Sequence, residues 1–122
     1  MSRFTFDVLA EAIREFAVDR DWEKFHSPKN LSMAISIEAA ELMENFLWAE
    51  PDAAIPTERK ETIAHEMADV LIYLIRLAQV ADINLADAIE RKLALNAEKY
   101  PAHKVRGSAR KYSDYSEDKS SK

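Results

Sequence analysis

Apolar residues recur with a helical period along the first hundred residues. The first series has the spacing i, i+3, i+4, i+7 that marks one face of an amphipathic helix, and it predicts a helix from about Thr5 to Arg20. Pro28 and Asn30 interrupt the pattern, and Asn30 is the expected N-cap of a second helix that runs to about Trp48. The apolar stripes of these two helices are Leu9, Ala12, Ile13, Phe16 and Ala17, then Leu31, Ala34, Ile35 and Leu42.

Two more helices are predicted beyond residues 49–56, a loop that contains two prolines. Thr57 is the expected cap of the third helix, which continues to about Ala81. Asn84 is the expected cap of the fourth, which Pro101 ends. Because loops this short favour antiparallel neighbours, the pattern predicts an all-α, four-helix bundle-like protomer over residues 1–100. Residues 101–122 are expected to be a polar, basic, disordered tail, since they have too few apolar residues to offset their ordering entropy.

Composition agrees with this class of fold and removes several kinds of chemistry. The 122 residues suffice for one core, and a single glycine with four prolines is too little for the turns of a β-rich fold. One glycine cannot build a P-loop or a dinucleotide-binding fingerprint. The absence of cysteine excludes disulfides, thiolate nucleophiles, zinc fingers and iron–sulfur clusters, and it fits a reducing cytoplasm.

Charge and hydropathy bound the expected partners. The net charge of −5 argues against a protein that binds nucleic acid through its backbone. Residues 67–81, the most apolar run, are interrupted by Asp69 and Arg76 and are too few to span a bilayer, so no membrane partner is expected. The first residues lead into an acidic amphipathic segment unlike a signal peptide, which agrees with a cytoplasmic location.

Carboxylates occupy positions where the predicted helices should be apolar. Glu38 falls on the apolar stripe of the second helix, and Glu41 follows one turn later on the same side. The third helix is apolar on most sides, and its polar exceptions form one line: Glu66, Asp69, Tyr73 and Arg76. Buried carboxylates repel one another and are costly to desolvate unless a cation lies between them. If these helices pack antiparallel, the two carboxylate pairs converge.

Four converging carboxylates form an oxygen-only donor set, which suits Mg²⁺, with Mn²⁺ as the alternative, rather than zinc. His65 directly precedes Glu66 and cannot supply the Glu-x-x-His pattern of a di-iron bundle. A single Glu-x-x-Glu on a helix is usually a solvated face, but two pairs on apolar stripes favour a metal site. Mg²⁺ held by few carboxylates typically completes its shell with phosphate oxygens and water, which indicates a phosphate-containing substrate.

Candidate groups for binding such a substrate accompany the carboxylates. The end of the fourth helix is suited to meeting phosphates, and aromatic or imidazole side chains suited to stacking on a base flank the second helix or lie on the carboxylate line. Most aromatic residues simply pack in cores, so each alone is a weak signal. The first set is Lys92, Asn96, Lys99 and Tyr100, and the second is Trp22, His26, Trp48 and Tyr73.

These residues resemble those of a known family. Glu38-x-x-Glu41, a gap of 24 residues and Glu66-x-x-Asp69 resemble the metal signature of the all-α nucleoside triphosphate pyrophosphohydrolases, the MazG-like superfamily. Residues 20–31, 46–48, 69–74 and 92–101 are similar to the dCTP pyrophosphatase branch of that superfamily. The resemblance covers about residues 5–101.

The resemblance implies an activity. Members of the superfamily cleave nucleoside triphosphates between the α and β phosphates with Mg²⁺, and many of them remove surplus or aberrant deoxynucleotides. They assemble as homodimers or homotetramers in which a neighbouring subunit completes the pocket.

The resemblance also implies roles for single residues. Metal ligation is implied for Glu38, Glu41, Glu66 and Asp69; contact with triphosphate or sugar for Lys92, Asn96 and Tyr100; and the base pocket for Trp22, Trp48 and Tyr73. Glu41 is the first candidate for deprotonating the attacking water, and Glu38 is the second.

The chain departs from the branch at Ile13, where animal relatives have a histidine on the first helix that faces the base. The choice of base depends on that position, whereas the metal chemistry does not. Two alternatives stay open. One is a broad-specificity MazG-like enzyme or a phosphoribosyl-ATP pyrophosphohydrolase. The other is a non-catalytic helical module that binds a nucleotide or only oligomerises.

Overall fold

The structure is a computed structural model, and it describes residues 5–109. These residues are α-helical and contain no strand, so the all-α class is confirmed. The elements are α1 (Phe6–Asp19), η1 (Glu23–Phe25), α2 (Pro28–Glu44), η2 (Thr57–Arg59), α3 (Lys60–Val80), α4 (Leu85–Lys99) and α5 (Ala102–Val105). The chain divides between Ile83 and Asn84 into two compact units, and each is described by itself. None of the helices described between residues 5 and 109 has the length and apolar character needed to cross a membrane.

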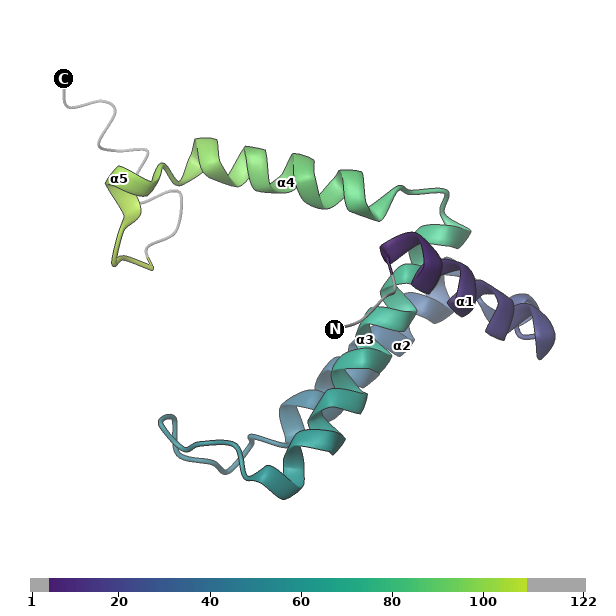
Figure 1. Ribbon diagram of the computed structural model, residues 1–122, viewed down its shortest axis with the longest axis horizontal. Helices are drawn as coiled ribbons and strands as arrows, with labels where there is room; N and C mark the ends of the chain where they lie inside the picture. Colours follow the sequence, from purple (N-terminus) through teal and green to yellow (C-terminus); the bar gives the residue numbers. More distant parts are fainter. Residues whose placement is uncertain (1–4, 110–122) are drawn as a thin grey trace. The chain divides into compact units, whose positions relative to one another are not determined.

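Helices α2 and α3 form the main packing contact of the first unit, and they run antiparallel side by side (Figure 1). At one end, the side-chain nitrogen of Asn45, just after α2, donates to Glu66 near the start of α3. At the other end, Arg76 of α3 donates to His26, just before α2. The apolar side chains buried on these helices are Leu31, Ile63, Ile75 and Ala78.

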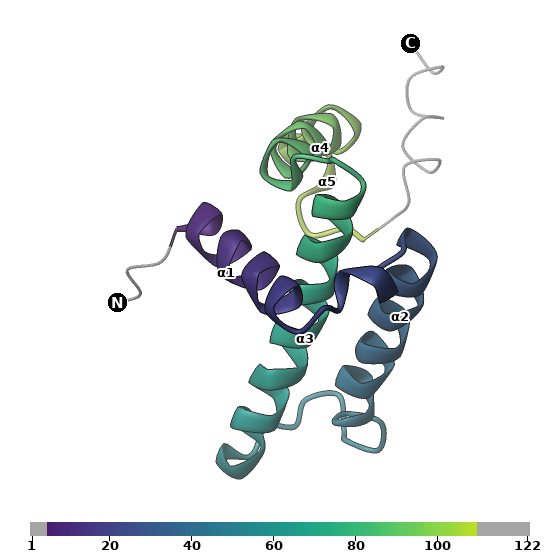
Figure 2. The ribbon, with the colours of Figure 1, turned by 90° about the vertical axis from the view of Figure 1, so that its right-hand side faces the viewer.

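Helix α1 crosses α3 toward the end where α3 finishes (Figure 2). Ala17 is the buried residue of α1, and its small side chain permits a close approach of the two helices. The side-chain nitrogen of Gln79 on α3 donates to the backbone oxygen of Ala10 at 2.7 Å, which fastens the first half of α1.

Helices α1 and α3 both end in a left-handed residue although no glycine is present there. Asp21 and Asp82 each have a φ of 55°, a region that aspartate tolerates better than most residues. After α1, the backbone nitrogen of Trp22 donates to the oxygen of Ala17 at 3.0 Å, which is the six-residue bond of a Schellman motif. This ending turns the chain sharply and places Trp22 against α1, where its ring meets Phe16 edge-on at 5.7 Å.

Helix starts follow the sequence expectations in part. Thr5, expected as the approximate first residue of the first helix, is its N-cap. As expected, Asn84 caps α4 through its side-chain oxygen, and α4 ends at Lys99 before Pro101. The expectation that Asn30 caps α2 is wrong, because Ser27 does so by accepting from the backbone nitrogen of Asn30. The reason is Pro28 at the first helical position, which keeps the preceding residue extended, at a ψ of 155° for Ser27.

Two further boundaries differ from expectation. Thr57 does not cap α3; it begins the 3₁₀ turn η2, and α3 starts at Lys60 without a side-chain cap. Helix α2 ends at Glu44 rather than near Trp48, because the side-chain nitrogen of Asn45 donates to the last carbonyl oxygens of the helix.

The first residues of the segment expected to be a disordered tail form a short helix. Residues 102–105 form the single turn α5, and residues 110–122 lie outside the described residues. The assignment of residues 1–100 to one domain stays a prediction.

The cap of α2 gives a test of the fold. We expect Ser27→Ala to lower the free energy of unfolding by about 1 kcal/mol, because the backbone N–H of Asn30 loses its acceptor. Ser36→Ala is the matched control, since Ser36 lies inside α2 and its hydroxyl bonds only back to Ser32. Urea denaturation at one protein concentration measures both, and an equal loss of stability in the two variants would contradict the cap.

Candidate active site

Four carboxylates meet where α2 and α3 pack. Glu38 is half-buried on α2, and burial is the largest reason that its pKa lies above the ordinary glutamate value. A hydrogen bond with Glu41 and the negative charges of Glu41, Asp69 and Glu66 raise the pKa of Glu38 further. The antiparallel arrangement therefore brings together the four acidic residues that the sequence singled out.

One oxygen of this cluster has no partner. Oε2 of Glu38 is enclosed, and no group among residues 5–109 donates a hydrogen bond to it. A buried acceptor without a donor is costly, and nearby carboxylates add repulsion. The cluster therefore fits a cation chemically, with hard oxygen donors of the kind that Mg²⁺ takes.

The carboxylate side chains are not arranged around a single metal position. Among residues 5–109, no three His, Cys, Asp or Glu side chains are close enough, as they stand, to hold one metal ion. Ligation by all four therefore requires their side chains to turn inward. Glu41 is exposed, so it is free of the packing that constrains Glu38.

Asn45 positions one member of the cluster, and the sequence analysis missed it. Its side-chain nitrogen donates to Oε2 of Glu66 and to the backbone oxygens of Glu41 and Leu42. The available signal was spacing, since Asn45 follows Glu38 and Glu41 at i+7 and i+4 on the same side of the helix.

A pocket of about 560 Å³ adjoins the carboxylates within the first unit. Its walls are mainly the apolar stripe of α1 and one face of α3. Asp69 lines this pocket and is also one of the charges that act on Glu38, so the cluster and the pocket are contiguous. The lining residues are Leu9, Ala12, Ile13, Phe16, Ala17, Trp22, His26, Ala68, Asp69, Leu71, Ile72, Tyr73, Ile75 and Arg76.

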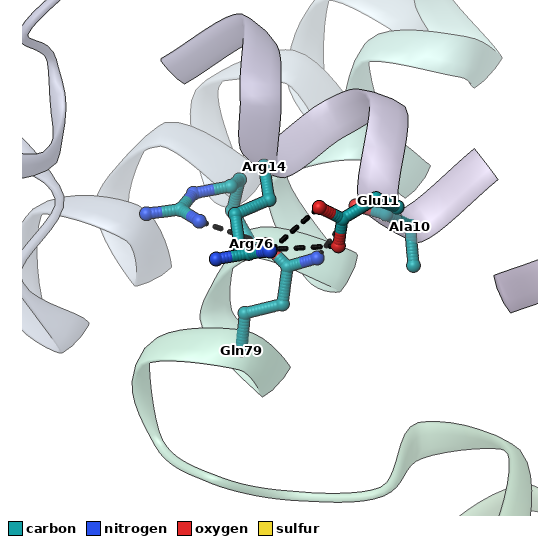
Figure 3. Close-up of polar contacts among 5 residues, drawn as sticks. All are labelled: Ala10, Glu11, Arg14, Arg76 and Gln79. Carbon is teal, nitrogen blue, oxygen red and sulfur yellow. Dashed lines mark hydrogen bonds and ion pairs between the residues drawn. The ribbon is translucent and has the colours of Figure 1, made fainter. Parts of the chain in front are cut away.

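A buried polar network adjoins the pocket, since its members Arg76 and His26 are among the lining residues. Arg76 is only 5% exposed, its Nε donates to Nδ1 of His26 at 3.2 Å, and its Nη1 donates to Oε1 of Gln79 at 2.7 Å. Gln79 in turn donates to Ala10, so one network joins α3, the segment before α2 and α1. Figure 3 shows Arg76 and Gln79 of α3 beside Ala10 of α1, with the Arg14–Glu11 ion pair nearby.

The network determines the state of His26. Because Nε of arginine can only donate, Nδ1 of His26 must accept, so the imidazole is neutral and its proton lies on Nε2. Burial, and then the positive charge of Arg76, lower the pKa of His26, while Glu23 acts weakly in the opposite direction.

The predicted base-binding residues separate into two groups. Trp22, His26 and Tyr73 lie in the pocket, although the three come from different segments of the sequence. Trp48 is 92% exposed in the loop after α2 and is not among the lining residues.

The predicted phosphate- or sugar-binding residues all belong to the second unit. There Asn96 and Tyr100 are half-buried and Lys92 and Lys99 are exposed along α4. Lys92, Asn96 and Lys99 lie on the last turns of α4, at spacings of four and three residues, and Tyr100 follows directly as the C-cap of the helix.

The arrangement has two chemically different ends. The carboxylates can hold a divalent cation and with it a polyanion, and the apolar pocket with aromatic walls can enclose a flat ring. Arg76 was noted in the sequence only as a polar exception on α3. Its hydrogen-bond partner His26 lies fifty residues away in the sequence. Residue spacing therefore could not predict a binding role for Arg76.

Several known proteins are similar to this chain. The model of the MazG-like family matches residues 33–115. The dCTP pyrophosphatase 1 of Mus musculus is 42% identical over 120 residues, which cover 92% of this chain and 71% of the relative. The Homo sapiens protein of the same name is 43% identical over 123 residues, covering 92% and 72%. A solved pyrophosphatase structure from Archaeoglobus fulgidus DSM 4304 has 42% identity and a TM-score of 0.76, covering 83% of this chain and 96% of that one.

The neutral His26 gives a test of the network. The unfolded chain binds a proton near the ordinary histidine pKa of 6.5, and the folded protein does so only at lower pH. The stability due to neutral His26 is therefore complete above the unfolded pKa and is lost as the pH falls through it toward the folded pKa. Urea denaturation from about pH 7.5 to about pH 5 should show a steeper fall for wild type than for His26→Asn, whose side-chain oxygen can still accept from Arg76. Parallel curves would contradict the network.

Proposed function

The chain belongs to the MazG-like family, and on that premise we propose that it is a Mg²⁺-dependent nucleoside triphosphate pyrophosphohydrolase acting on dCTP or modified deoxypyrimidine triphosphates. In this reaction water adds to the α-phosphorus, the bond to the β-phosphate breaks, and a nucleoside monophosphate and pyrophosphate leave. The relatives named dCTP pyrophosphatase 1 support the substrate, at 42–43% identity over 92% of the chain.

The proposal rests on the position of Asp69 between the pocket and the carboxylate cluster. This residue lines the apolar pocket and belongs to the carboxylate cluster, so a base in the pocket places its phosphates beside the acidic side chains. An apolar pocket next to a few convergent polar groups is the usual form of a small-molecule site.

The donor set supports Mg²⁺ in particular. The residues that would hold it are Glu38, Glu41, Glu66 and Asp69. The unpartnered Oε2 of Glu38 and the oxygen-only set favour a hard cation, with Mn²⁺ as the alternative. When bound, Mg²⁺ supplies charge neutralisation to the triphosphate and to the leaving pyrophosphate.

The chain's own residues bind and orient the substrate. Trp22 and Tyr73 offer aromatic faces to the base, and the apolar residues of α1 and α3 exclude water around it. Glu41 is our first candidate for accepting the proton of the attacking water, because its exposed carboxylate can reach solvent. Glu38, half-buried, is the second. Asn45 orients Glu66 through its side-chain amide.

Residues of the second unit and the loop after α2 complete the proposal. We assign Lys92, Asn96, Lys99 and Tyr100 to the triphosphate and sugar, and Trp48 to the base. The support for these assignments is the family pattern of the sequence.

A homodimer or homotetramer would cover large apolar side chains that are exposed in the first unit, among them Trp48 at 92% and Met43 at 58%. The cytoplasmic location expected from the sequence stays a prediction.

The activity is tested by pyrophosphate release with Mg²⁺ from dCTP, its 5-modified forms, dTTP, dUTP, dATP, dGTP and the ribonucleotides. We expect turnover of deoxycytidine triphosphates. Glu38→Gln should lower kcat/KM by about 100-fold or more, the scale of removing one electrostatic stabiliser from an active site. Glu44→Gln, the same change on an exposed residue of the same helix, should leave it unchanged.

The other outcomes separate the alternatives. Activity confined to purine nucleotides or ribonucleotides would keep the chemistry and favour a broad-specificity or phosphoribosyl-ATP enzyme. Folded protein that releases no pyrophosphate from any of these substrates would favour a non-catalytic module.

Metal binding is tested separately from turnover. Without Mg²⁺, Glu38→Gln should be more stable than wild type, because it removes one charge from a repelling cluster. With Mg²⁺ at about 100 times its Kd, wild type should gain about 2.7 kcal/mol of unfolding free energy, and the variant should gain less. Urea denaturation with and without Mg²⁺ measures both quantities. An identical response of the two proteins to Mg²⁺ would remove Glu38 from the site.

A further inference from the structure

Arg76 is a buried cation without a carboxylate partner. It is 5% exposed, whereas the ion pairs found among residues 5–109 are exposed and lie elsewhere: Arg14–Glu11, Lys24–Asp21 and His65–Glu61. A buried charge is normally paired or fully hydrogen-bonded, since desolvation is otherwise costly. A residue kept in this state at the wall of a pocket indicates a ligand that supplies acceptors.

The protein itself uses only part of the guanidinium. Two of its five N–H groups bond to neutral acceptors, Nδ1 of His26 and Oε1 of Gln79. The hydrogen bonds that Arg76 makes to His26 and Gln79 come from Nε and Nη1, and the side chain lines the pocket. His26 and Gln79 therefore hold the planar group in place and leave donors for a molecule inside the pocket.

Position along α3 shows which part of a nucleotide Arg76 meets. It follows Asp69 by seven residues, about 10 Å along the helix at 1.5 Å per residue. The carboxylates and the phosphates they attract lie at the Asp69 end, so Arg76 lies beyond the sugar, at the edge of the base. This argument rests on the proposed function, which places the phosphates beside the carboxylates.

We propose that Arg76 is the specificity-determining residue of the pocket and donates two hydrogen bonds to O2 and N3 of cytosine. A guanidinium fork requires two adjacent acceptors. Among the pyrimidines, cytosine offers this pair, whereas uracil and thymine present the N3–H donor beside each carbonyl. Guanine also has two adjacent acceptors, O6 and N7, and the relatives named dCTP pyrophosphatase favour cytosine over it.

The proposal also accounts for an apolar residue on the opposite wall. Ile13 of α1 lines the same pocket and has no hydrogen-bonding side chain. Polar recognition of the base edge within the first unit must therefore come from α3 and the segment before α2. The donors there are Arg76, the Nε2–H of His26, the indole N–H of Trp22 and the hydroxyl of Tyr73, and Arg76 is the one that presents a two-pronged fork.

Arg76→Gln tests the proposal by a ratio rather than by a single rate. A glutamine amide offers one donor and one acceptor, which suits the O2–N3 edge of uracil better than the O2–N3 edge of cytosine. We expect the ratio of kcat/KM for dCTP to kcat/KM for dUTP to fall by about 10- to 100-fold, mainly through loss of dCTP turnover. Arg14→Gln, an exposed arginine of α1, is the matched control and should keep the wild-type ratio.

A modified substrate gives the same test without altering the protein. In 3-deaza-dCTP a C–H group replaces N3, so one of the two acceptors is missing. Wild type should lose about 10-fold or more in kcat/KM on this analogue relative to dCTP, and Arg76→Gln should lose little further. Even if Arg76→Gln does not fold, wild type that accepts the analogue as well as dCTP would show that no donor meets N3.

The outcomes separate this proposal from the proposed function. An equal loss on dCTP and dUTP in Arg76→Gln would make Arg76 structural and overturn the proposal. Wild type that accepts 3-deaza-dCTP as well as dCTP, or an Arg76-dependent preference for dGTP, would overturn it as well.

If wild type hydrolyses none of these substrates, the proposed function fails, and calorimetric binding of dCMP against dUMP tests Arg76 alone. Tighter binding of dCMP by wild type but not by Arg76→Gln supports the proposal, and equal binding by wild type overturns it.

Discussion

The antiparallel contact of α2 and α3 is the constraint on which the rest of the structure depends. This contact sets Glu38, on the apolar stripe of α2, close to Glu66 and Asp69 of α3. The packed interface therefore contains carboxylates that repel one another. Repulsion raises the pKa of Glu38 and leaves one enclosed oxygen without a donor. A fold selected for stability alone would place an apolar residue there. The cost is understandable if a divalent cation joins the cluster, because a ligand bound only by the folded state restores the lost stability.

The opposite end of α3 has the opposite charge. Arg76 is buried there among neutral acceptors, and its bonds to His26 and Gln79 tie three segments of the first unit together. The pocket is lined mainly by apolar residues, and both Asp69 and Arg76 are part of its lining. A nucleoside triphosphate has matching polarity, with charge at its phosphates and hydrogen-bond acceptors on its base. In the function that we propose, base specificity and phosphate chemistry depend on residues seven positions apart on one rigid helix, which fixes their separation.

The single chain leaves much of its apolar surface exposed. Within the first unit, the large apolar side chains of Trp48 and Met43 are 92% and 58% exposed. The oligomer that we propose would cover such surface and would add groups to the pocket that the first unit lacks. In such an oligomer, the pocket formed by α1, α3 and the segment between α1 and α2 would be one chain's contribution to the site.

Local features were readable in the sequence, as was the convergence of the two carboxylate pairs, but the contacts around the pocket were not. The helical period located α1 to α4 to within a few residues, the Asn84 cap is a local bond, and Glu38 was conspicuous as an acidic residue on an apolar stripe. Sequence reasoning placed the α2 cap at Asn30 instead of Ser27, because it gave too little weight to the restraint that Pro28 imposes. The family resemblance implied a shared base pocket for Trp22 and Tyr73, but residue spacing alone did not show it, and nothing in the sequence showed that His26 accepts from Arg76. Those pairings depend on how the helices cross, which is decided by packing between distant segments and not by the spacing of residues within any one of them.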